Sequence, residues 1–449
     1  MRSRRRDNDR STVTCVMPPT DQRSGPGLPG APGGPAAASS RRAALAVLAL
    51  CTLINVVSRG VGESFAVFLL PVAETFAADR GALTGIYGLY MLAVGLMSPI
   101  AGTAFDRLGP RLTYGIGLSV FGLAYLLAGS ATALWQIYLL VGLGGAVGAS
   151  LIGMLPASGL ASRWFQAGLP VAMGVLSASL GIGILLFAPL VHALIEAFGW
   201  RAAYRALGAL LLGVLVVTAV LPWRRIAAGA PDVVSARRDA ARGTQAWSLR
   251  RALRTPVFWA LAGVMFFTSL STYAVAPQLV AYLVDAGVPP LRAASIYGLV
   301  GLTSIVGMIA AGALAQRFGE RRVAMLSYGS TIVGVGALAL VQHGSPLFFA
   351  GAFVLLFGTM QGSRGPLVAV LSARHFAGGA QTGIFGGILF GMGTGGALGA
   401  WGSGALFDLT GGYGSSFALS AAGAVCGLLL FLRVPGLGGT RREAANADR

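Results

Sequence analysis

Twelve apolar runs divide this chain, and each is long enough to cross a lipid bilayer as a helix, which takes about 20 apolar residues. The runs cover residues 43–75, 83–104, 110–130, 133–160, 168–197, 203–222, 256–284, 293–315, 322–342, 346–371, 381–406 and 414–432. Only helices and closed barrels satisfy their backbone in lipid, and the short alternating segments of a barrel are missing. We therefore predict an all-α integral membrane protein with twelve transmembrane helices.

The charge content agrees with this prediction. Only 11% of the residues are charged, against about 25% in soluble domains, so there are too few charges to coat a water-soluble globule. The net charge of +18 does not indicate a nucleic-acid partner, because no soluble domain exists to carry a basic face. The many small residues of 391–405 predict close helix packing.

The hydrophilic segments set the organisation. We expect a disordered tail at 1–42, six-helix halves at 43–222 and 256–432, a linker at 223–255 and a second tail at 433–449. If both termini are cytoplasmic, the tails, the linker and the inner loops collect 27 of the 33 arginines. This asymmetry follows the positive-inside rule, and we expect a multi-pass protein of the cell (inner) membrane with both termini in the cytoplasm.

The two halves carry related sequences. The segment after the second run contains Gly102, Asp106, Arg107, Gly109 and Arg111 at the spacing G-x-x-x-D-R-x-G-x-R. A degraded copy, offset by 210 positions, contains Gln316, Arg317, Gly319 and Arg321. The repeat indicates a duplication that gives two pseudo-symmetric halves.

The motif and its copy resemble the signature of the major facilitator superfamily, and the resemblance covers essentially all of 43–432. It implies a fold in which helices 1, 4, 7 and 10 line a central cavity. The glycines permit a tight turn, and Asp106 can accept hydrogen bonds from a helix N-terminus or an arginine. We expect the motif residues to latch the halves together when the cytoplasmic side is closed; alternatively, their charges only hold the topology. Gln316 replaces the acid in the second copy and predicts a weaker latch there.

Two further segments resemble the monocarboxylate transporter and oxalate/formate antiporter-like branch of that superfamily. They are the Trp164-Phe165 pair with the small-residue run that follows it, and Gly199-Trp200-Arg201 with Tyr204. The basic cluster expected after Trp164-Phe165 is replaced by Ala167-Gly168-Leu169, and the acidic-Gly-aromatic motif expected before helix 1 is absent. The resemblance implies a monocarboxylate substrate.

Ionisable residues inside apolar runs are costly and indicate function. Arg59 lies near the middle of the first run, with Glu63 one helical turn further on the same face. Either Glu63 neutralises Arg59, or the pair belongs to a substrate or proton site. Burial disfavours the charged form of a carboxylate, so Glu63 can bind a coupling proton and leave Arg59 to hold an anion.

The tenth run contains Gln361 and Arg364, far from both of its ends. If Arg364 faces the cavity together with Arg59, two guanidiniums suit a carboxylate better than a sugar or a cation. The alternative is that Arg364 points to the cytoplasmic vestibule. In the seventh run, Tyr273 and Gln278 flank Pro277 and are candidate substrate contacts, as is Tyr87 of the second run, although membrane tyrosines often belong to interfacial belts.

No enzyme signature is present, and we expect no catalytic residues, cofactor or metal site. The glycine-rich stretch 141–150 lies inside a run rather than between a strand and a helix, and no Walker motif indicates ATP as the energy source. We expect a monomer in the lipid membrane whose partners are a small-molecule substrate and a coupling proton.

The sequence thus predicts a secondary transporter of a small organic solute, a monocarboxylate or related organic anion, moved by alternating access with proton symport or exchange. Two alternatives remain open. One is a proton-coupled multidrug efflux pump, against which the missing Gly-Pro-x-x-Gly-Gly stretch in helix 5 counts. The other is a membrane sensor that keeps the fold without transporting.

Overall fold

The computed structural model describes residues 35–165, 168–231, 233, 247–376 and 381–433. Most of the expected N-terminal tail, residues 234–246 of the expected linker and nearly all of the C-terminal tail lie outside this part of the chain, so these assignments remain predictions. Within the described residues all regular structure is helical.

The N-terminal half begins with α1 (Pro35–Glu63) and α2 (Phe65–Phe76), which together form the first span, and continues with α3 (Arg80–Ala128). The fourth span is built from α4 (Leu134–Ile137), the π-helical η1 (Tyr138–Gly144), α5 (Gly145–Ile152) and α6 (Met154–Trp164). The half ends with α7 (Leu169–Ala219), and the short helices α8 (Trp223–Ala228) and α10 (Leu249–Ala252) lie in the region expected to be the linker.

The C-terminal half repeats this plan. Its first span comprises α11 (Pro256–Tyr273), the 3₁₀ turn η2 (Ala276–Gln278) and α12 (Leu279–Asp285), followed by α13 (Pro290–Phe318) and α14 (Glu320–Ala339). The tenth span comprises α15 (Pro346–Phe353), the π-helical η3 (Val354–Gly358), α16 (Thr359–Gln361) and α17 (Arg364–His375). The last two spans are α18 (Gln381–Thr410) and α19 (Gly414–Arg433).

Ten helices in the described residues are long and apolar enough to cross a membrane, and two of them contain two spans each. The 49-residue α3 and the 51-residue α7 would extend over about 75 Å at 1.5 Å per residue, more than twice the bilayer core. Each contains one glycine with left-handed backbone, Gly109 (φ +77°) and Gly199 (φ +78°), where the chain turns back. Dividing both helices there gives twelve spans and confirms the predicted fold class.

Spans 1, 4, 7 and 10 are all discontinuous. The breaks fall at Ser64, at Gly153, between Tyr273 and Leu279, and at Gly362–Ser363. Spans 4 and 10 also carry a π-helical segment at corresponding places, η1 and η3. Irregular backbone at membrane depth is tolerated only where it is buried in protein or lines a cavity, and π segments gather at functional sites. The breaks therefore mark these four spans as the ones where a polar site is to be sought.

Glycine pairs let the halves cross closely. A Cβ atom on Gly95 of α3 would lie 2.9 Å from Cα of Gly393 on α18. A Cβ atom on Gly301 of α13 would lie 2.5 Å from the carbonyl oxygen of Gly181 on α7. Without side chains at these points, backbones approach to contact distance, as expected from the small residues of 391–405.

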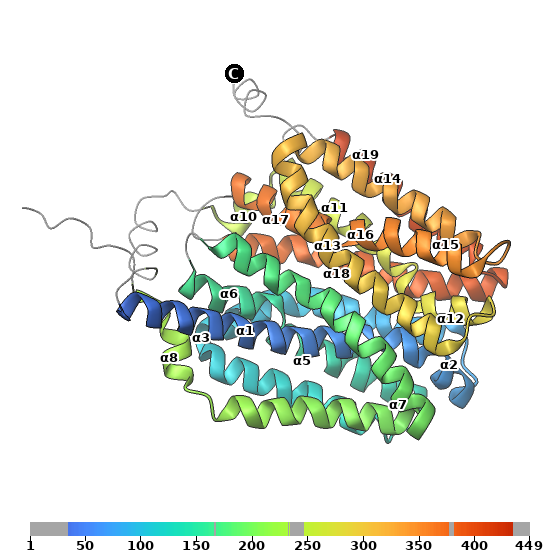
Figure 1. Cartoon of the computed structure of the whole chain (residues 1–449), viewed down its shortest axis with the longest axis horizontal. Helices are drawn as coiled ribbons and strands as arrows, with labels where there is room; N and C mark the ends of the chain where they lie inside the picture. The colour runs from blue at the N-terminus through green and yellow to red at the C-terminus, as the bar shows by residue number, and fades with distance from the viewer. Residues whose placement is uncertain (1–34, 166–167, 232, 234–246, 377–380, 434–449) are drawn as a thin grey trace, which may run out of the picture. The chain divides into compact units, whose positions relative to one another are not determined.

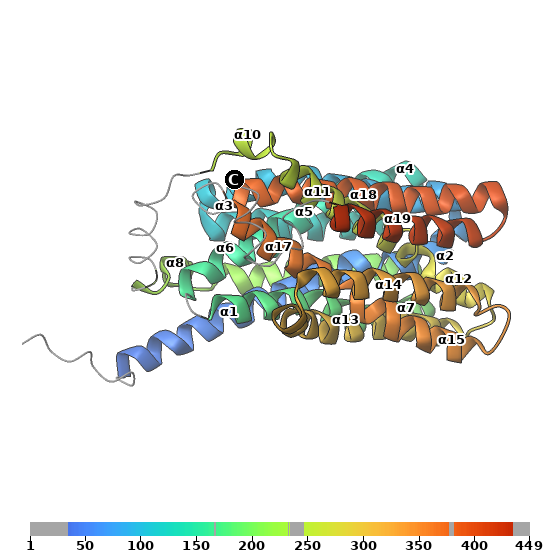
Figure 2. The same cartoon turned by 90° about the horizontal axis from the view of Figure 1, so that it is seen from above.

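The bundle has two ends, which we name by their residues. The motif end carries Gly109 and Gly319 (φ +85°), the turning glycines of the repeated motif, and the short helices α8 and α10 lie there. The far end carries the start of α3 at Arg80 and the end of α12 at Asp285, and α2, α12 and α15 lie toward it (Figures 1 and 2).

Candidate functional site

A buried carboxylate, that of Glu63 at the end of α1, joins the two halves. Its Oε2 atom accepts a hydrogen bond from the Tyr87 hydroxyl at 2.7 Å, and its Oε1 atom accepts one from the Tyr273 hydroxyl at 3.2 Å. Glu63 is only 6% exposed. Tyr87 lies on α3 of the N-terminal half and Tyr273 on α11 of the C-terminal half. One carboxylate is therefore shared by both halves.

The break between α1 and α2 adds a further contact across the interface. The Val67 amide bonds the carbonyl of Ser64 rather than that of Glu63, which would be its partner in a continuous α-helix. The freed Glu63 carbonyl accepts a hydrogen bond from the Tyr297 hydroxyl of α13, at 3.4 Å. Tyr297 was not among the predicted site residues, because nothing in the sequence shows that a carbonyl is free at this point.

Arg59 lies one turn before Glu63, but the two do not form an ion pair. The carboxylate oxygens are occupied by the tyrosines, and in the described part of the chain the Arg59 side chain has no hydrogen-bond or ion-pair partner. Arg59 is partly exposed, and its charge still acts on Glu63 and Tyr273. Its donors are therefore available to an anionic ligand.

Span 7, which supplies Tyr273, also contains buried polar side chains before and within its break. Gln278 is buried and donates through Nε2 to the Ser403 hydroxyl at 3.0 Å, while its Oε1 atom has no partner among the described residues. Within the same part of the chain, the hydroxyl of Ser269, one turn before Tyr273, is also buried without a partner. Buried polar atoms normally find partners, so unpaired ones on a broken helix mark places where a polar ligand can bind.

Arg364 and Gln361 lie on span 10, apart from these contacts. The Arg364 guanidinium is directed at α14, where it donates from Nε to the Ser327 hydroxyl (2.9 Å) and from Nη2 to the Ser327 carbonyl (3.0 Å). It also lies 4.2 Å from the Tyr328 ring centre. Gln361 is partly exposed. No hydrogen bond or ion pair among the described residues joins either side chain to Arg59 or Glu63.

The motif residues adopt the turn that the glycines require, but they do not hold the halves together in this conformation. Exposed side chains of this group are Asp106, Arg107, Arg111, Arg317 and Arg321. Among the described residues, none of these five forms a hydrogen bond or ion pair; Arg317 only stacks on Phe318. A Cβ on Gly102 would meet open space, and the side chain of Gln316 lies outside the described part of the chain. The latch therefore remains a prediction for another conformation.

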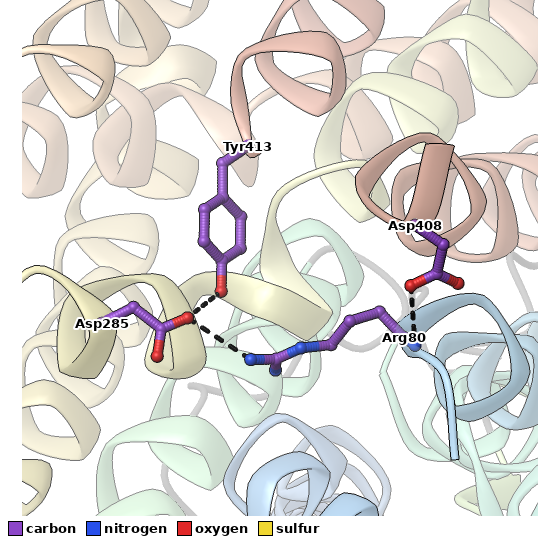
Figure 3. A network of polar contacts seen from close by, with 4 residues as sticks. All are labelled: Arg80, Asp285, Asp408 and Tyr413. Carbon is purple, nitrogen blue, oxygen red and sulfur yellow. Dashed lines mark hydrogen bonds and ion pairs between the residues drawn. The ribbon is translucent and has the colours of Figure 1, made fainter. Parts of the chain in front are cut away.

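At the far end, a polar network does join the halves (Figure 3). Asp408 of α18 accepts hydrogen bonds from the backbone amides of Arg80 (3.0 Å) and Gly81 (2.6 Å), the first residues of α3. The Arg80 guanidinium forms an ion pair with Asp285 at 3.3 Å. Asp408 thus caps the N-terminus of a helix in the opposite half, where the amides have no helical partner and a negative charge is favoured.

The hydroxyl of Tyr413 completes this far-end network by donating to Asp285 at 2.6 Å. Tyr413 lies between α18 and α19, and burial together with this hydrogen bond raises the pKa of its hydroxyl. It therefore stays protonated and remains a donor. No sequence pattern singles out Asp285, Asp408 or Tyr413, because each is an ordinary polar residue at the end of an apolar run.

Replacing Asp408 with alanine should loosen the far end. A lost helix cap costs about 1 kcal/mol, which is about a fivefold change in an equilibrium constant. A cysteine reporter placed at Thr84, a completely buried residue of the interface, should react about five times faster with maleimide in the Asp408→Ala background. Asp79→Ala is the matched control, because Asp79 precedes α3 but its side chain makes no cap hydrogen bond. Equal labelling rates in the two backgrounds would contradict the assigned role.

The sequence profile of the Major Facilitator Superfamily matches residues 48–388, and the chain belongs to this superfamily. Monocarboxylate transporter 13 of Bos taurus is 29% identical over 380 residues, which cover 84% of this chain and 85% of that protein. Monocarboxylate transporter 11 of Homo sapiens is 27% identical over 399 residues, covering 85% and 81%. An uncharacterized transporter of Bacillus subtilis (strain 168), YcxA, is 26% identical over 359 residues, covering 78% and 85%.

A solved structure has the same fold. The xylose transporter XylE from E. coli, in a partially occluded inward open conformation, superposes with a TM-score of 0.69 at 12% identity, covering 87% of this chain and 98% of that one. The chain is therefore a multi-pass membrane transporter of small solutes, in the branch that resembles the monocarboxylate transporters, and not an enzyme.

Proposed function

We propose that this protein couples the movement of a small organic anion, of the monocarboxylate class, to the movement of a proton by alternating access. The observation that carries the proposal is the buried Glu63 carboxylate, hydrogen-bonded by hydroxyls from both halves. A carboxylate with no arginine bonded to it and little water around it can bind a proton reversibly.

Protonation of Glu63 would change how the halves hold each other. Hydrogen bonds to an ionised carboxylate are about twice as strong as neutral ones. The ionised form accepts a charge-assisted bond from Tyr273 across the interface, whereas a proton on Oε1 turns this oxygen into a hydroxyl, which is a weaker acceptor. Proton binding therefore weakens one contact between the halves, and proton release restores it, which is the coupling that a transport cycle needs.

Two observations support an anion as the substrate. Arg59 lies one turn from Glu63 with its donors unoccupied, and a guanidinium matches the two oxygens of a carboxylate. Relatives that cover most of this chain are named monocarboxylate transporters. A neutralised Glu63 would leave Arg59 as the charge facing the substrate.

The arginine distribution supports an orientation for this cycle. With the motif end in the cytoplasm, 27 of 33 arginines are cytoplasmic, as the positive-inside rule favours. The far-end network then closes the outer side, and the conformation faces inward, as the partially occluded inward open conformation of XylE does. In this orientation the protein lies in the cell membrane with both termini inside.

Uptake into proteoliposomes tests the function. Vesicles that carry the protein should accumulate labelled acetate, lactate or pyruvate at least tenfold faster than empty vesicles when the outer medium is made more acidic, and a protonophore should abolish accumulation. Release of a hydrophobic cation in exchange for protons, with no uptake of any acid, would replace this proposal by drug efflux.

A further inference from the structure

A second polar cluster, apart from Glu63, surrounds the start of α17 in the C-terminal half. It consists of the Arg364 guanidinium, the hydroxyls of Ser327 and Thr331 on α14, and the hydroxyl of Ser363. All four residues are at most 2% exposed. We call this group the Arg364 cluster.

The charge of Arg364 has no counter-charge in the described part of the chain. Its Nε and Nη2 atoms donate to Ser327 and Thr331, which are neutral. Its Nη1 atom is buried and has no hydrogen-bond partner. A buried cation surrounded only by neutral groups is unfavourable, and a guanidinium with a free donor is ready to receive an anion.

The backbone adds to the positive potential at the same place. Span 10 is interrupted at Gly362–Ser363, and the 12-residue α17 starts at Arg364. The Ser363 side chain does not cap this helix; it bonds the Met360 carbonyl and the Ser327 hydroxyl instead. Pro366 has no N–H, so the first turn presents the amides of Arg364 and Gly365, which the Ser363 side chain does not cap, and the positive end of the helix dipole lies beside the guanidinium.

There is room for a ligand to approach this helix start. A Cβ atom added to Gly365, the second residue of α17, would meet no atom within 4 Å. Because Nη1 is buried, an anion that enters this space takes the Nη1 donor of Arg364 as its second partner only after a movement at the start of α17 that opens this donor.

We propose that the Arg364 cluster is a second binding position for the carboxylate group of the transported acid, in addition to the one that Arg59 offers. The naming of the acid rests on the proposed function, but the anion site itself rests on the buried guanidinium and the helix start. No hydrogen bond or ion pair among the described residues joins this cluster to Glu63, so an anion held here does not bond the proton-binding carboxylate directly. The carboxylate then supplies the counter-charge that Arg364 lacks.

Thermal unfolding of the purified protein tests the subsite directly, since a ligand that binds only the folded state raises Tm. Acetate, added at constant ionic strength in place of methanesulfonate, should raise the Tm of the wild type in a saturable way. Arg364→Gln should weaken the apparent affinity for acetate at least tenfold. Arg292→Gln is the matched control, because Arg292 is exposed on α13, and it should respond as the wild type does.

A second variant keeps the test valid if Arg364→Gln does not fold. Gly365→Val leaves every contact of Arg364 in place and fills the open space, so it should also weaken the acetate response about tenfold. An equal acetate response in wild type, Arg364→Gln and Gly365→Val would overturn the proposal. A response to chloride but not to acetate would overturn the assignment to a carboxylate.

The subsite and the proposed function can fail separately. If Arg364→Gln takes up acids with an unchanged KM, the subsite is wrong while the function stands. If the wild type takes up no acid but acetate still raises its Tm through Arg364, the transport proposal is wrong while the anion site stands.

Discussion

Replacing Glu63 with glutamine should abolish accumulation driven by a proton gradient while leaving exchange of the solute intact. Glutamine has nearly the same shape and can still accept a hydrogen bond from Tyr87 or Tyr273, but it cannot take up or release a proton. We expect the initial rate of gradient-driven uptake to fall at least tenfold, about 1.4 kcal/mol of lost coupling. The wild-type rate should rise as the outer pH falls, and the rate of the variant should not change with pH.

The measurement compares two assays on the same proteoliposomes. One follows labelled solute under an imposed pH gradient, and the other follows counterflow with solute on both sides and no gradient. Glu196→Gln is the matched control, because the Glu196 side chain is 73% exposed and pairs only with His192 within α7. Uptake by Glu63→Gln that still follows the pH gradient would exclude Glu63 as the proton carrier.

The sequence identified Glu63 because placing a charged group inside a membrane span costs free energy. A carboxylate in the middle of an apolar run has no topological role, so its position alone indicates function. A different argument, the kink expected at Pro277, selected Tyr273 and Gln278, and the structure places the Tyr273 hydroxyl on Glu63. Which hydroxyl reaches which oxygen depends on how two distant spans cross, and this information is not local in the sequence.

Arg59 and Arg364 show the limit of that argument. Both are arginines inside apolar runs, and in one of the two interpretations of Arg364 both face one cavity. The structure leaves the Arg59 donors unpaired beside the Glu63 carboxylate and directs Arg364 into the hydroxyls of α14. A charge within an apolar run predicts a functional residue. The direction of its long side chain depends on the rotation of the helix about its axis. These spans are apolar on all faces, so their sequence does not determine that rotation.

In this conformation, the hydrogen bonds expected of the repeated motif are formed by other residues, at the far end of the bundle. Asp106 was expected to accept hydrogen bonds from a helix N-terminus across the two halves. Asp408 does so at the opposite end of the bundle, on the first amides of α3. Since a transporter closes one end at a time, a motif that holds one conformation is unpaired in the other. The sequence predicts a latch at the motif, but it does not show in which conformation such a latch would form.

Substituting Gly404 with alanine should open the far end. Gly404 of α18 lies against α3, and a Cβ atom there would contact the Thr84 hydroxyl and approach the Arg80 carbonyl oxygen to 2.6 Å and its carbon to 2.8 Å. A backbone carbonyl cannot rotate away as a side chain can, so the methyl group must separate the halves. Overpacking of this kind costs about 1–3 kcal/mol, which shifts the ratio of closed to open molecules by about five- to 150-fold.

Distances between spin labels at two exposed far-end residues measure this shift. Cysteines replacing Glu74 on α2 and His343 after α14, in a background without native cysteines, report the separation of the halves. The distance distribution of Gly404→Ala should move to longer values. Gly402→Ala is the matched control on the same helix, because its Cβ would meet only the flexible Leu419 side chain at 3.4 Å. If Gly404→Ala keeps the wild-type distribution while retaining its fold, the far end does not close through this contact, and the polar network of Asp408, Arg80 and Asp285 must hold it.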